Sequence, residues 1–94
     1  MYNLPVNYDK LQRHERRAVR EQYIKEQNGL CHHCKQPLNG KPAEDVFNKP
    51  INWRNFPDGF LNFPVHLHHH HNTGMTIGAV HAYCNAVLWQ YHGE

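Results

Sequence analysis

Two pairs of potential metal ligands with the same spacing constrain the fold of this 94-residue chain more than any other feature. Cys31 and Cys34 form the first pair, and His81 and Cys84 form the second, with two residues between the partners in each case. A structural zinc ion takes four tetrahedral ligands of this kind. Because the two pairs use all three cysteines of the chain, we expect the four side chains to bind one zinc ion.

The length of the chain supports a metal-stabilised fold. A chain this short buries little apolar surface, and such domains often depend on a metal ion or on disulfides. Three cysteines do not pair completely among themselves, which favours metal ligation in a reducing compartment. The sequence shows no secretory leader and no long apolar run, so we expect a single cytoplasmic domain over residues 1–94 with no membrane contact.

The chain divides into four expected segments. Residues 1–28 read as an extended arm and a basic helix, with Asp9 as its cap and Gly29 ending it. Residues 29–36 form a knuckle with the first pair of ligands, and residues 37–62, rich in proline and asparagine, form a long loop. Residues 63–94 predict a strand over 63–67, a turn over 68–75, a strand over 76–79 and a helix over 80–91. The sequence therefore predicts a small α+β fold.

Basic residues are concentrated in the first part of the chain. Residues 1–41 hold eight Lys or Arg and four acids, a charge of +4, whereas residues 42–94 hold two and four, a charge of −2. Such a segment suits contacts with phosphate groups, although it is also typical of an ordinary solvated helix. The candidate phosphate contacts are Arg13, Arg16, Arg17 and Arg20. In the 37–62 loop, Trp53 and Arg54 are weaker candidates for contacts with bases.

A run of histidines, His66 and His68–His71, lies where the hairpin is expected. Alternate residues of a strand point to opposite faces, so neighbouring histidines can differ in role, one binding a metal ion and the next facing a substrate. Asn85 directly follows a proposed zinc ligand, and its amide oxygen is a candidate partner for His68 across a shared cavity.

Together these residues resemble the HNH endonucleases, especially the endonuclease VII-like branch, which carries CxxC, then DHDHxTG, then CxxCN. Residues 31–34, 68–74 and 81–85 match the three elements in order, with His81 replacing the first cysteine of the third. The match covers half of the chain. It implies a zinc-stabilised ββα-metal fold (HNH, or His-Me finger) preceded by the basic helix.

By position, the resemblance implies that His69 is the general base, and that His68 and Asn85 bind a catalytic divalent ion such as Mg²⁺, Mn²⁺ or Ni²⁺. His70 stands where the branch usually has an acid, and His71 is implied to contact phosphate. A neutral imidazole can take a proton from water, while the ion stabilises charge on the phosphate oxygens. A backbone carbonyl near residue 65 or 67 is expected to orient the ring of the base.

The implied activity is hydrolysis of DNA phosphodiester bonds with one catalytic metal, leaving 5′-phosphate and 3′-hydroxyl ends. The expected partner is duplex or branched DNA, bound by a monomer or a homodimer, and small proteins of this branch are common in phages. Two other interpretations stay open. A non-catalytic zinc module that binds DNA or protein needs neither His69 nor Asn85, and a metal-storage or metal-sensing protein does not explain the Thr73-Gly74 turn.

Overall fold

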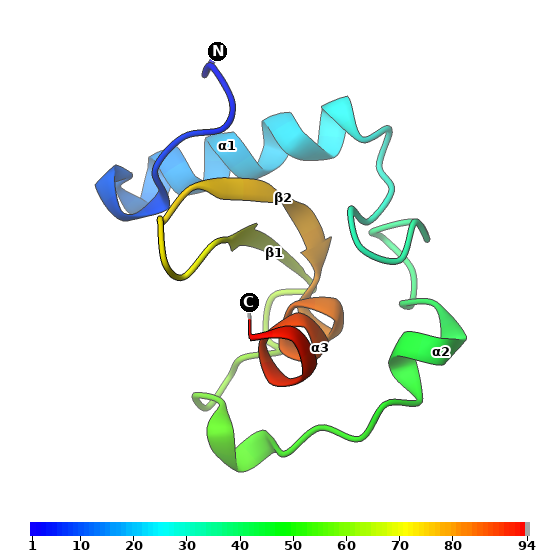
Figure 1. Ribbon diagram of the computed structural model, residues 1–94. Helices are drawn as coiled ribbons and strands as arrows, with labels where there is room; N and C mark the ends of the chain where they lie inside the picture. Colours follow the sequence, from blue (N-terminus) through cyan, green and yellow to red (C-terminus); the bar gives the residue numbers. More distant parts are fainter. Residues whose placement is uncertain (94) are drawn as a thin grey trace.

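The computed structural model describes residues 1–93, and Glu94, the last residue of the expected 63–94 segment, lies outside them. The chain is a small α+β protein in which a two-stranded antiparallel sheet lies between two helices (Figure 1). This coarse architecture confirms the expected order of helix, strand, strand and helix. The elements are η1 (Tyr8–Lys10), α1 (Arg13–Glu26), α2 (Glu44–Phe47), η2 (Trp53–Asn55), β1 (Val65–His69), β2 (Thr76–His81) and α3 (Ala82–His92).

The long helix α1 begins later than predicted, and Asp9 does not cap it. Asn7 instead accepts a hydrogen bond from the Asp9 backbone at 2.9 Å and starts the short helix η1. The cap of α1 is Gln12, whose backbone N–H donates to the Glu15 carboxylate at 3.0 Å. At the other end, Gly29 has a φ of +75° and donates to the Ile24 carbonyl at 2.8 Å. This C-terminal geometry stops the helix near the predicted glycine.

Both hairpin strands end later than predicted, and β1 also begins later, at Val65 and not at Phe63. β1 continues through His68 and His69, which were expected in the turn, and β2 continues to His81, so that α3 starts at Ala82 and not at Val80. The register pairs His68 with Gly78, and a bulge follows before the next pair. A bulge adds one residue to one strand and changes the direction of nearby side chains. His66, His68 and His69 therefore lie on the strand, whereas His70 and His71 lie in the connection that follows it.

The N-terminal arm pairs with the start of β2. The Thr76 backbone N–H donates to the Val6 carbonyl at 2.9 Å, and the Tyr8 N–H donates to the Gly74 carbonyl at 2.7 Å. The Val6 N–H also donates to the Thr76 hydroxyl at 3.0 Å. The arm thus lies along the hairpin as a short third strand-like segment.

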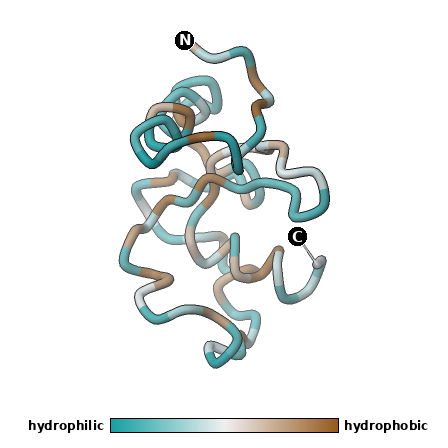
Figure 2. Tube along the Cα trace, turned by 90° about the vertical axis from the view of Figure 1, so that its left-hand side faces the viewer, coloured by the Kyte–Doolittle hydropathy of each residue, from teal (hydrophilic) through white to brown (hydrophobic). Residues whose placement is uncertain are grey.

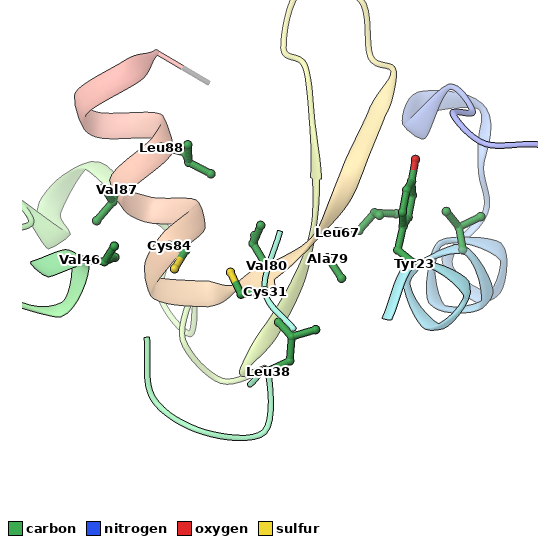
Figure 3. Packing of buried hydrophobic residues seen from close by; sticks show 11 residues of the cluster. Tyr23, Cys31, Leu38, Val46, Leu67, Ala79, Val80, Cys84, Val87 and Leu88 are labelled. Carbon is green, nitrogen blue, oxygen red and sulfur yellow. The ribbon is translucent and has the colours of Figure 1, made fainter. Parts of the chain in front are cut away.

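The core lies on both faces of the small sheet (Figure 3). On the α1 side, Leu67 packs near Tyr23, and on the α3 side Val80 lies close to Cys84. Hydrophilic residues prevail along α1 (Figure 2), whose buried residues are Val19 and Tyr23. Within residues 1–93, none of the helices has both the length and the apolar character needed to cross a membrane.

The 37–62 segment is folded against α3. Tyr83 donates its hydroxyl to the Lys49 carbonyl at 2.8 Å, and Gln90 bonds both to the Pro50 carbonyl and to the Asn52 backbone N–H. The segment contains α2 and η2, with Val46 buried. These bonds give an ordered position to what the sequence indicated only as a long loop.

Candidate functional site

Cys31, Cys34, His81 and Cys84 come together as the sequence predicted. Their ligand atoms all lie within 4.8 Å of one another, and three of the four side chains are buried. The His81 Nδ1 atom lies 3.4 Å from the Cys34 sulfur and 3.6 Å from the Cys84 sulfur. Tetrahedral zinc, with Zn–S bonds of about 2.3 Å and Zn–N bonds of about 2.1 Å, separates sulfur and nitrogen by about 3.6 Å. The group could therefore hold one zinc ion with little rearrangement.

A second contact orients the ring of His81. Its Nε2 atom lies 2.9 Å from the Pro37 carbonyl oxygen. Because a carbonyl only accepts hydrogen bonds, Nε2 carries the proton and donates it, which leaves the lone pair of Nδ1 facing the sulfurs. Histidines that bind metals are commonly held in one tautomer by such a bond.

The electrostatics of the thiols also favour a cation. The pKa of Cys31 is lowered to about 4, chiefly by a hydrogen bond from the Cys84 thiol. The pKa of Cys84 is raised by the same bond and by burial. Figure 3 shows the two side chains close together between α3 and the knuckle. A buried thiolate is costly without a compensating charge, and metal binding supplies that charge by replacing thiol protons.

The knuckle is attached to the sheet by Gln27, a residue that the sequence did not single out. Its side chain donates to the Ala79 carbonyl at 2.9 Å and accepts from the Ala79 N–H at 2.9 Å. The His32 backbone N–H also donates to Ala79 at 3.0 Å. Among the described residues, neither His32 nor His33 belongs to the metal-binding group. These contacts hold the first ligand pair against the strand that supplies His81.

A second cluster lies on β1 and the first turns of α3. The Asn85 amide donates through Nδ2 to the Nδ1 atom of His66 at 3.1 Å. This bond uses the amide nitrogen and not the amide oxygen, which is the atom expected to bind a metal ion. The sequence assigns no role to His66, although it belongs to the histidine run. The signal was its position two residues before His68, on the same face of the strand.

A cavity of 340 Å³ brings three of the predicted site residues together. Its lining includes His69, His71 and Asn85, together with the aromatic residues Phe56, Phe60 and Trp89. His68 is buried, with 3% of its surface exposed, and it is not part of the lining. The structure thus joins the expected base and the expected amide in one space, whereas the other expected metal ligand, His68, does not line that space.

His69 is held on two sides. The Tyr8 ring stacks on it with centroids 3.9 Å apart and an interplanar angle of 6°. Burial lowers the pKa of His69, although a hydrogen bond to the Leu67 backbone works in the opposite direction. That bond places a proton on one ring nitrogen, as the sequence predicted for a carbonyl near residue 65 or 67, and leaves the other as an acceptor. His69 is therefore a neutral, oriented imidazole near pH 7.

The four predicted arginines all lie on α1, but their surroundings differ. The Arg16 guanidinium lies 4.0 Å from the centre of the Tyr8 ring, and its Nε donates to the Tyr8 carbonyl at 3.3 Å. Arg17 pairs with Glu21 at 3.5 Å, while Arg13 is exposed. The charge of Arg20 contributes to the lowered pKa of His66, after the larger effect of burial. Arg16 and Arg20 thus lie on the side of α1 nearest the histidines.

Comparison with protein-family models, with curated proteins and with solved structures finds no match for the chain. What the chain can do is therefore inferred from its own residues. They form one group able to hold a metal ion, and one cavity that joins an oriented imidazole to a carboxamide.

Proposed function

We propose that this protein is a metal-dependent DNA endonuclease of the HNH type, with zinc as a structural ion and His69 as the general base. The observation that carries the proposal is the shared cavity, in which His69, His71 and Asn85 meet. A zinc module that only binds a partner has no need of an oriented imidazole and a carboxamide in one cavity.

The imidazole has the properties of a base for water. A general base near neutral pH must be unprotonated and within reach of its proton donor. The lowered pKa of His69 supplies the first property. The stacked Tyr8 ring and the Leu67 backbone bond fix the direction of the free nitrogen, so that it accepts a proton from a water molecule in the cavity.

The residues that would hold the catalytic ion are Asn85, through its amide oxygen, and His68. A bound divalent ion supplies stabilisation of the charge that develops on the phosphate oxygens. The donor set is one imidazole and one amide, with no carboxylate. Imidazole suits nickel and other transition metals, whereas magnesium prefers carboxylate oxygens. Because Mn²⁺ shares the preference of Mg²⁺ for oxygen ligands, we expect Ni²⁺ to support higher activity than either Mg²⁺ or Mn²⁺.

The test is cleavage of supercoiled plasmid by zinc-loaded protein with added Mg²⁺, Mn²⁺ or Ni²⁺. His69→Ala should lower the rate by about a hundredfold or more, the usual contribution of a positioned general base, while zinc content and DNA binding stay unchanged. His14→Ala, a change of an exposed histidine on α1, is the matched control and should cleave at the parental rate. Equal rates for His69→Ala and the parent would overturn the assigned role. A parent that cleaves nothing with any of the three ions would favour the non-catalytic zinc module.

A further inference from the structure

The proposed reaction uses only one side of the 340 Å³ cavity. His69, His71 and Asn85 form that polar side, while Phe56, Phe60 and Trp89 add a group of aromatic rings to the lining, here called the aromatic wall. The volume falls within the range of about 300–1,000 Å³ that is typical of small-molecule sites. The aromatic wall has no part in activating water or holding a phosphate, so its presence beside these groups calls for another explanation.

The wall is built from rings that support one another. The Phe56 ring lies 5.2 Å from Trp89 and 4.9 Å from Phe60, and Phe60 lies edge-on to His66 at 4.7 Å. The segment that carries the two phenylalanines is fastened to α3 through Gln90. Contacts of this kind fix the rings in place before any ligand binds, which lowers the entropic cost of binding.

Trp89 is the most accessible of these rings. It lies on α3 one helical turn after Asn85, and 41% of its surface is exposed. A large aromatic ring that lines a cavity and has part of its surface open offers a ligand a surface for stacking. The exposed Asn55 also lines the cavity, and its amide can both donate and accept hydrogen bonds.

We infer that the aromatic side of the cavity is a binding site for the nucleobase next to the phosphate that is cleaved. The inference rests on the proposed function for the position of that phosphate beside His69 and Asn85. Stacking on aromatic side chains is a general means of binding bases that are not paired, and a base inside a duplex must leave the stack to enter a pocket. The substrate class is therefore DNA with an unpaired nucleotide at the cleavage site.

The kinetic test uses a short duplex with one unpaired nucleotide and the same duplex with an abasic site at that position. Trp89→Ala should raise KM for the first duplex by about tenfold, a common cost of losing a base–aromatic stack, and Trp89→Tyr should restore most of the loss. Phe63→Ala, which removes a ring that is 69% exposed and not part of the cavity lining, is the control. On the abasic duplex, Trp89→Ala should have no further effect, because the partner of the ring is already gone.

A binding test separates this inference from the proposed function. The unpaired position carries the fluorescent adenine analogue 2-aminopurine, and the zinc-loaded protein is titrated without a catalytic ion. The parent and Phe63→Ala should quench the fluorescence by stacking, and Trp89→Ala should not. If the parent quenches but cleaves no DNA, the base site stands and the nuclease proposal fails. If the parent cleaves both duplexes equally and Trp89→Ala matches Phe63→Ala, the base site is overturned and the nuclease proposal stands.

Discussion

At the scale of single residues, the protonation of His69 decides whether it can act as a base. Burial lowers its pKa below the ordinary value of 6.5. Protonation therefore occurs at a lower pH than for an exposed histidine, and the neutral form persists further into acid. The proposed activity should be constant near neutral pH and should be lost as the pH falls through the lowered pKa.

This prediction is checked by the cleavage rate at saturating metal between about pH 5 and pH 8, the range in which histidines titrate. The acid limb should have its midpoint below 6.5. Zinc content is measured at each pH, because metal ligands must be deprotonated to bind and acid therefore weakens the structural site as well. A midpoint above 6.5 with zinc retained would contradict the assignment of the base to a buried imidazole.

His66 acts on a neighbouring residue by orienting it. Its Nδ1 accepts the Asn85 amide proton, and this bond fixes which way the amide oxygen points. His66→Ala should raise the metal concentration needed for half-maximal cleavage by about tenfold, the lower range for loss of an outer-shell partner. The maximal rate should recover at high metal concentration. His66→Gln, which retains a hydrogen-bond acceptor, should raise this metal concentration by less than His66→Ala does. A fall in the maximal rate that added metal does not restore would argue against a positioning role.

At the scale of elements, α1 is the proposed DNA-binding surface, and the surroundings of its arginines separate their effects. Arg13 is exposed, and Arg17 takes part only in a surface ion pair with Glu21, a type of pair that contributes little to stability. Arg16 instead packs on Tyr8, the residue that stacks on His69. Its removal would disturb the catalytic geometry as well as DNA binding.

The double change Arg13→Ala and Arg17→Ala therefore tests phosphate contacts without altering the histidine site. The affinity for duplexes of unrelated sequence should fall by the same factor. The slope of log affinity against log salt concentration should become shallower by about two, one for each lost phosphate contact. Lys41→Ala, an exposed basic residue outside α1, is the control and should leave the slope unchanged. An unchanged slope in the double variant would place the DNA surface elsewhere on the molecule.

At the scale of the whole molecule, the metal-binding group joins two parts of the chain that are far apart in the sequence. Cys31 and Cys34 come from the knuckle, and His81 and Cys84 come from the junction of β2 and α3. Cys31 and Cys84 are fully buried within the core cluster. Binding of zinc at such a site is coupled to folding and contributes on the order of 10 kcal/mol.

We expect one zinc ion per chain, and Cys84→Ser should unfold the protein or sharply lower its melting temperature. Elemental analysis and thermal unfolding, with and without a chelator, measure both effects. His32→Ala, a change of an exposed histidine outside the metal-binding group, is the matched control and should retain zinc. A folded parent protein that contains no zinc would refute the structural role of the ion.

The sequence by itself determined the features that depend on local spacing. The two ligand pairs, the order of the last three elements and the stop of α1 near Gly29 all follow from residues close together in the chain, where backbone conformation is set by neighbours. The predicted ends of the helices and strands were less exact. Asn7, and not Asp9, accepts the capping hydrogen bond, and it caps η1 and not α1. Pairing of His81 with Val65 extends β2 to His81.

Only the tertiary structure decided which distant side chains meet. The stack of Tyr8 on His69, the bond from Asn85 to His66 and the packing of the 37–62 segment on α3 join residues far apart in sequence. No local pattern encodes these contacts, because they depend on how elements pack and on the bulge that follows His68. A one-residue change of register moves a side chain to the other face of a strand. The direction in which each histidine points is therefore a property of the folded sheet and not of the histidine run.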